Sequence, residues 1–194
     1  MQMTLPSGTN AVIEKPVSNR REQGLVIIPD VMGLRPLFHD MVKRLAIEWD
    51  IPVCSFELYP GLEHLNVEER LETASRLEDA RVIGDAIEAA DATQSEQVGI
   101  LGFCMGGMYT LKTVSSQRFS KHCSFYGMIR VPKAWKSESQ SEPMDCLQEG
   151  DADSVLAIVS SEDTRTPKED VNLLSASRVT VISYKEADHG FEHD

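Results

Sequence analysis

The feature that most constrains the fold is a regular alternation of short apolar runs with longer segments of helical periodicity. Short apolar runs rich in β-branched residues are typical of strands buried in a sheet. They occur at residues 25–29, 52–56, 97–103, 122–126, 154–160 and 179–184. Helices are expected between them, from Pro36, from about Asn66, over 105–116 and near 168–176. Because strands that alternate with helices form βαβ units, we expect an α/β fold with a mostly parallel sheet and helices on both faces.

Two of the intervening segments carry local signals. Asn66 and Glu69 have the spacing of a capping box, and the apolar stripe behind them continues to about Ala90, which predicts one long helix. Residues 131–150 are polar and contain two prolines, so we expect a loop there that can include one short helix.

Length and charge limit the classes of function. A chain of 194 residues with 41% hydrophobic residues predicts one domain over 1–194. The net charge of −12 repels phosphate backbones and anionic lipid, so neither nucleic acid nor a membrane is expected as a partner. The first residues, MQMTLPSGTN, lack a charged segment followed by an apolar one, and we expect a cytoplasmic protein.

The four cysteines, at positions 54, 104, 123 and 146, do not have the spacing of metal ligands. No metal site and no cofactor are therefore expected. Cys54 and Cys123 lie in apolar runs and are predicted to be small buried hydrophobic residues.

Cys104 differs from the others because it stands between a predicted strand and a predicted helix. Gly102-x-Cys104-x-Gly106 is the cysteine form of the nucleophile elbow, in which a sharp turn exposes the central side chain. The start of the following helix would favour a thiolate, and the N–H of Met105 would be one oxyanion donor.

A thiol nucleophile needs a base and a group that orients the base. His189 follows the strand predicted at 179–184, and Asp163 follows the strand predicted at 154–160. The chain order of nucleophile, acid and histidine is that of α/β-hydrolases, and all three residues follow strands whose ends would meet at one edge.

With these residues in this order, the chain resembles the dienelactone hydrolase family, whose members are α/β-hydrolases with a cysteine nucleophile. The resemblance rests on GFCMGG around Cys104, SSEDTRTP around Asp163, DHGF around His189 and PDVMGL at 29–34. It implies the α/β-hydrolase fold and hydrolysis of a small ester or lactone through an acyl-cysteine intermediate. Cys104 would attack the carbonyl, His189 would transfer the proton, and Asp163 would orient His189.

The resemblance also implies secondary roles. Asp30 matches the family's thiol-activating glutamate but is one methylene shorter, and the N–H of Val31 would be the second oxyanion donor. His193 stands where dienelactone-cleaving members have a substrate-binding arginine. Arg35, which could replace that arginine, and His193 are therefore candidate substrate contacts.

Tyr59 and Tyr126 are further candidates for the substrate pocket. Members of the family also continue into a final helix, which this chain is expected to lack. A second copy of the chain, in a homo-oligomer, is expected to cover the face left open.

Three alternatives stay open at this point. Cys104 with His122 could form the site of a glutamine-amidotransferase-like enzyme. A hydrolase-fold binding protein could keep the elbow without turnover. Cys104 could also be a redox-sensing thiol, with Cys123 or Cys146 as the resolving cysteine.

Overall fold

An eight-stranded sheet forms the centre of the molecule in the computed structural model, which describes residues 1–16, 18 and 21–191. Its strands are β1 (Gln2–Thr4), β2 (Asn10–Glu14), β3 (Gln23–Ile28), β4 (Val53–Phe56), β5 (Gln97–Phe103), β6 (Lys121–Phe125), β7 (Val155–Ser160) and β8 (Thr180–Tyr184). They lie in the order β1-β2-β4-β3-β5-β6-β7-β8. β2 pairs antiparallel with β1 and β4, and the other neighbours pair in parallel. The predicted parallel sheet is confirmed, and β1 and β2 extend it by an antiparallel edge that the sequence did not indicate.

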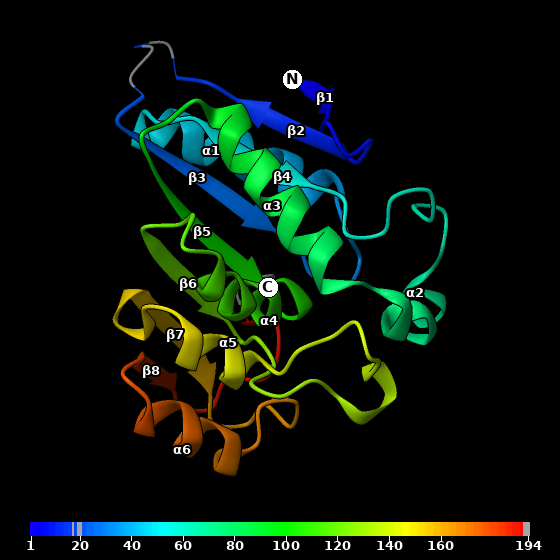
Figure 1. Cartoon of the computed structure of the whole chain (residues 1–194), viewed down its shortest axis with the longest axis vertical. Helices are drawn as coiled ribbons and strands as arrows, with labels where there is room; N and C mark the ends of the chain where they lie inside the picture. The colour runs from blue at the N-terminus through cyan, green and yellow to red at the C-terminus, as the bar shows by residue number, and fades with distance from the viewer. Residues whose placement is uncertain (17, 19–20, 192–194) are drawn as a thin grey trace.

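Helices cover both faces of this sheet, as predicted. They are α1 (Pro36–Trp49), α2 (Val67–Thr73), α3 (Asp79–Thr93), α4 (Met105–Lys112), α5 (Pro143–Glu149) and α6 (Lys168–Ala176). In Figure 1, α3, α4 and α5 lie in front of the strands and α1 lies behind them. Strands β3 and β4 are almost entirely buried between these layers, which explains their continuous apolar runs.

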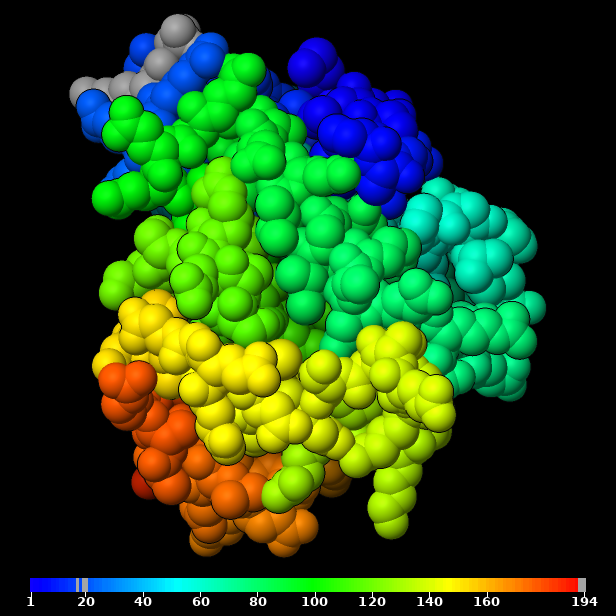
Figure 2. All heavy atoms as spheres, viewed as in Figure 1, coloured from blue at the N-terminus to red at the C-terminus, as the bar shows by residue number. Residues whose placement is uncertain are grey.

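The prediction of one long helix from Asn66 is wrong, although its capping box is present. Asn66 Oδ1 accepts from the N–H of Glu69, and Glu69 Oε2 accepts from the N–H of Asn66. The chain leaves the helix after a 3-10 turn and is extended at Leu77 before α3 begins. Gln140 Nε2 donates to the carbonyl oxygens of Ala74 and Leu77, so a distant loop supplies the donors of the missing turn. That loop packs beside the α2 region on one side of the molecule (Figure 2).

The side of the sheet near β8 is only partly covered. Ile182 and Tyr184 of β8 are 44% and 50% exposed. No α-helix follows β8 among the described residues. No helix within 1–16, 18 and 21–191 has the length and apolar character needed to cross a membrane. The single-domain organisation of residues 1–194 stays a prediction.

The parallel strands fix where a site can form. The carboxyl ends of β3, β5, β6 and β7 lie at one edge of the sheet, and the segments that follow them meet there. Ligands of open α/β sheets bind at this edge.

Candidate active site

Cys104 occupies a strained turn between β5 and α4. Its φ of 53° and ψ of −114° are rarely adopted by residues other than glycine. The turn requires close packing, because a Cβ on Gly102 would lie 2.2 Å from the carbonyl oxygen of Gly106. A Cβ on Gly106 would in turn lie 2.2 Å from the carbonyl oxygen of Ile28 in β3. The two glycines therefore let α4 approach the sheet closely enough to hold Cys104 in this conformation.

Asp163 is held rigidly by the loop that follows β7. Its Oδ1 accepts a hydrogen bond of 2.8 Å from the N–H of Arg165, and Thr166 Oγ1 donates to its Oδ2 at 3.1 Å. The same Oδ2 accepts from Nδ1 of His189 at 2.8 Å. Burial raises the pKa of the Asp163 carboxyl, but the hydrogen bonds from His189 and Arg165 outweigh it and hold the pKa below its usual value. Asp163 is therefore a preorganised anion facing His189.

His189 presents its other nitrogen to the interior of the site. Burial by itself lowers the pKa of His189, but the interactions with Asp163 and with Cys104 raise it from 6.5 to about 9. Nε2 is buried and has no hydrogen-bond partner among the described residues. The ring of Tyr126 packs edge-on against the imidazole, with 4.9 Å between centroids. His189 is thus oriented through Nδ1, which leaves Nε2 for a proton on sulfur or on a reacting group.

The loop after β3 forms the facing wall. Asp30 Oδ1 accepts from the N–H of Met32 and from Nη1 of Arg35, both at 2.9 Å. The N–H groups of Val31 and of Met105 donate to no other atom in the part of the chain that the structure describes. They remain available to an oxygen at the mouth of the elbow.

These segments enclose a cavity of about 150 Å³. Its lining combines the thiol and the imidazole with an acid, a cation and an apolar wall: Asp30, Val31, Met32, Val67, Leu71, Cys104, Tyr126, Arg165, His189 and Gly190. A space of this size can hold a small acyl group next to sulfur, provided that the rest of the substrate reaches solvent.

Comparison with known proteins gives the family. Residues 9–194 match the model of the "Dienelactone hydrolase family". The chain belongs to the dienelactone hydrolase family. The "Probable 2-oxo-3-(5-oxofuran-2-ylidene)propanoate lactonase" of Bradyrhizobium sp. is 26% identical to it, over 72% of this chain and 60% of that protein. The "Putative carboxymethylenebutenolidase" of Synechocystis sp. is 24% identical, over 92% of this chain and 79% of that protein.

A solved structure shows the same fold. The crystal structure of the "Putative Dienelactone Hydrolase from Klebsiella pneumoniae subsp. pneumoniae" superposes with a TM-score of 0.83 at 20% sequence identity. The superposition covers 98% of this chain and 87% of the other. The predicted α/β-hydrolase fold is thereby confirmed.

The predicted substrate contacts of this dienelactone hydrolase family member differ in whether they line the cavity. Tyr126 lines the cavity. Tyr59 is buried instead, with its hydroxyl 3.3 Å from the sulfur of Met105, so its place is in the packing behind the elbow. Arg35 pairs with Asp30 rather than lining the cavity. His193 lies outside the described residues.

His122 does not approach the elbow. It stands opposite Ile100 in the sheet, near the start of β6, and its Nδ1 lies 2.9 Å from Ser154 Oγ. Cys104 follows the far end of the neighbouring strand β5. This separation disfavours the glutamine-amidotransferase-like arrangement.

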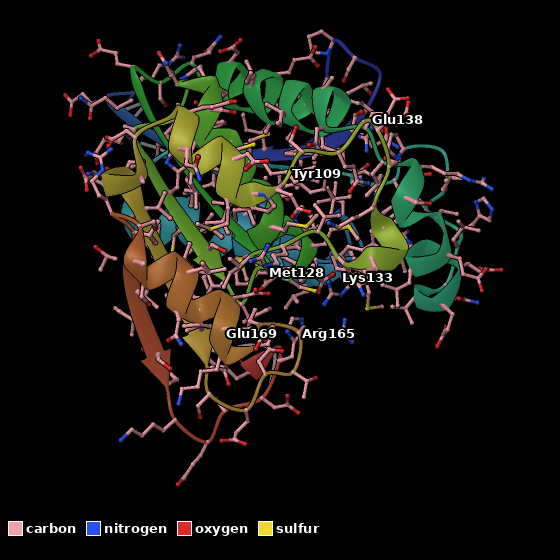
Figure 3. The ribbon with its side chains drawn as sticks, turned by 60° about the horizontal axis from the view of Figure 1, so that its bottom comes forward. Tyr109, Met128, Lys133, Glu138, Arg165 and Glu169 are labelled. Atoms are coloured by element: carbon pink, nitrogen blue, oxygen red, sulfur yellow. The ribbon has the colours of Figure 1, made fainter. Side chains whose placement is uncertain are left out.

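Five cavity residues were not among the predicted site residues: Met32, Val67, Leu71, Arg165 and Gly190. Arg165 had the clearest available signal, since it lies two residues beyond the predicted triad acid. It stands on the loop that leads into α6 (Figure 3). Val67 and Leu71 belong to α2, which the sequence indicated only as the first part of one long helix with an apolar stripe. No group of three or more His, Cys, Asp or Glu side chains within the described ranges is arranged to hold a metal ion.

Proposed function

We propose that this protein hydrolyses a small ester or lactone through an acyl-cysteine intermediate, with Cys104, His189 and Asp163 as its triad. The observation that carries the proposal is that His189 lines the same cavity as the strained Cys104 turn and is bonded through Nδ1 to Asp163 at 2.8 Å. Acyl transfer requires a nucleophile and a base that meet in one cavity, with an acid bonded to the far side of the base.

Acylation follows from this arrangement. His189 Nε2 accepts the thiol proton, and Cys104 Sγ forms a bond to the carbonyl carbon while the carbonyl π electrons move to oxygen. The N–H groups of Met105 and Val31 stabilise that oxyanion. The bond from carbon to the ester oxygen then breaks, and the leaving oxygen takes the proton from the imidazolium.

Deacylation repeats these steps with water. His189 removes a proton from a water molecule, and the resulting hydroxide attacks the thioester carbon. The carbon–sulfur bond breaks, His189 returns its proton to Cys104 Sγ, and the carboxylic acid product releases its remaining proton to solvent and leaves as a carboxylate. Asp163 stabilises the imidazolium in both halves of the cycle.

Asp30 and Arg35 act together in this proposal. Asp30 lines the cavity with Cys104, and Arg35 Nη1 donates to its Oδ1 at 2.9 Å. Asp30 is the acid that assists formation of the thiolate. Arg35 then orients Asp30 and does not bind substrate directly.

Arg165 suggests the class of substrate. Arg165 lines the cavity, and its guanidinium has no ion-pair partner among the residues that the structure describes. Arginine binds carboxylates with paired hydrogen bonds. The Bradyrhizobium relative is named for a lactone that bears a propanoate group. We therefore expect an ester or lactone that carries a carboxylate.

The proposal is tested by the release of nitrophenolate from p-nitrophenyl acetate. Wild-type protein and His122→Ala should turn over at similar rates, whereas Cys104→Ala should be inactive. Loss of activity in His122→Ala would favour the amidotransferase-like alternative. A folded wild-type protein without turnover would favour a binding protein.

Two further predictions concern the cellular context. The exposed apolar side chains of β8 support a homo-oligomer in which a second copy covers this face, and light scattering of the purified protein tests it. The cytoplasmic location stays a prediction from the sequence.

A further inference from the structure

Glu57 and Arg70 form a buried ion pair outside the triad. They are 2% and 4% exposed, and Arg70 Nη1 lies 3.1 Å from Glu57 Oε1. Neither side chain lines the catalytic cavity. Because two buried charges lose hydration, an ion pair of this kind is weak evidence for stability alone, and in some proteins it specifies one arrangement of the elements it joins. The hydrogen bonds of Glu57 and Arg70 show which segments of the chain this ion pair holds.

Glu57 fixes the loop that carries the proposed second oxyanion donor. Its Oε2 accepts from the N–H of Leu34 at 2.9 Å, and its Oε1 accepts from the N–H of Tyr59 at 2.8 Å. The turn before Leu34 closes through a bond from the N–H of Gly33 to the carbonyl of Asp30. Through this short turn Glu57 sets the position of Asp30 and Val31.

Arg70 fixes the opposite, apolar wall. Its Nη2 donates to the carbonyl of Glu63 at 2.8 Å, and its Nε donates to the carbonyl of Leu65 at 3.1 Å. These bonds tie the segment before α2 to the helix itself. Val67 and Leu71, on either side of Arg70 in α2, line the cavity.

A third contact reaches the elbow. The guanidinium carbon of Arg70 stands 5.2 Å from the ring centroid of Tyr59, and the Tyr59 hydroxyl lies 3.3 Å from Met105 Sδ. Met105 carries the first proposed oxyanion donor. This one ion pair therefore contacts the segments that position both oxyanion donors and the apolar wall of the cavity.

We infer that Glu57 and Arg70 are positioning residues. They hold the two oxyanion donors and the apolar wall of the cavity in place relative to Cys104. This inference rests on the proposed function. It differs from a purely structural role because it predicts a loss in catalysis that exceeds any loss in folding. A displacement of about 1 Å in a reacting group can cost about 100-fold in rate.

The chain offers a matched control in a second buried pair. Lys112 Nζ lies 2.8 Å from Asp79 Oδ1 and links α4 to the start of α3. Neither residue lines the cavity. Glu57→Gln and Asp79→Asn each remove one buried carboxylate, so a general effect of breaking a buried ion pair affects both variants.

The experiment measures kcat and KM for p-nitrophenyl acetate per mole of folded protein, together with hydrogen exchange at the N–H of Leu34. We expect Glu57→Gln to lose about 100-fold in kcat with little change in KM and to exchange faster at Leu34. Asp79→Asn should match the wild type in both. Should Glu57→Gln fail to fold, Arg70→Lys, which keeps the charge but loses the planar fork, takes its place.

The two readouts separate the two proposals. A wild-type protein without turnover contradicts the proposed function, and exchange at Leu34 still decides whether Glu57 fixes the loop. Unchanged exchange at Leu34 in the Glu57 variant, or equal losses of kcat in the Glu57 and Asp79 variants, overturns the inference.

Discussion

Replacing Asp163 with asparagine removes one charge from the triad and keeps the shape of the side chain. Asp163 Oδ2 lies 2.8 Å from His189 Nδ1, and His189 has a pKa of about 9 against an ordinary 6.5. This difference favours the imidazolium by roughly 3 kcal/mol, since one pKa unit is about 1.4 kcal/mol. Burial lowers the pKa of His189, so the favourable interactions with Asp163 and Cys104 together exceed that net value.

We therefore expect Asp163→Asn to lower the pKa of His189 towards 6.5. The asparagine amide can also donate to Nδ1, which would place the imidazole proton on the wrong nitrogen. Loss of the carboxylate from a Ser-His-Asp triad lowers kcat by about 10⁴-fold, and we expect a similar loss here.

The assay titrates the ¹⁵N-labelled imidazole by NMR and measures kcat on the same samples. Asp188→Asn is the matched control, because Asp188 Oδ1 accepts from the main-chain N–H of His189 at 2.7 Å and, within the described part of the chain, makes no hydrogen bond to the imidazole ring. A pKa of His189 that stays near 9 in Asp163→Asn, or falls equally in Asp188→Asn, would refute this reasoning.

Three other predictions concern substrate, pH and packing. Arg165→Ala should lower kcat/KM for p-nitrophenyl hemisuccinate, relative to the acetate, by about 10- to 100-fold, the equivalent of one hydrogen bond to a charged group; Lys168→Ala should leave the ratio unchanged, and equal effects would contradict the role of Arg165. Burial lowers the pKa of His122 from 6.5 to about 4. Between pH 6.5 and about pH 4, His122 is therefore protonated in the unfolded chain but not in the native state. The free energy of unfolding is unaffected by His122 above pH 6.5 and falls by roughly 3 kcal/mol as the pH decreases to about 4. Urea unfolding should show this fall and show less of it in His122→Gln. Gly106→Ala should cost about 1–3 kcal/mol or more by overpacking, because its Cβ would meet a main-chain oxygen of β3. Gly84→Ala, whose Cβ meets nothing within 4 Å in α3, should be stabilising in the same assay.

The fold and the triad candidates follow from local signals in the sequence. Strands β3 and β5 are short, buried apolar runs, and parallel pairing brings their ends to one edge. Cys104, Asp163 and His189 each follow a strand that ends at this edge. Their proximity therefore needed no knowledge of the loops. The order of strands in the sheet required the structure.

The remaining features depend on contacts between residues far apart in the chain. The break at Leu77 arises because Gln140, 63 positions away, binds its carbonyl. Tyr59 looked like a pocket residue in a loop, but it packs behind the elbow on the sulfur of Met105. Glu57 and Arg70 stand 13 positions apart, and no local signal shows that the fold buries them together as an ion pair. Such pairings carry no periodicity that a sequence could reveal.

The most direct test of the account is the mass of the protein after rapid acid quenching of its reaction with p-nitrophenyl acetate. We predict a transient species heavier by one acetyl group, with the group on the peptide that contains Cys104 and absent from Cys104→Ala. An enzyme that turns over without any such adduct, or one acetylated at another residue, would contradict the acyl-cysteine mechanism.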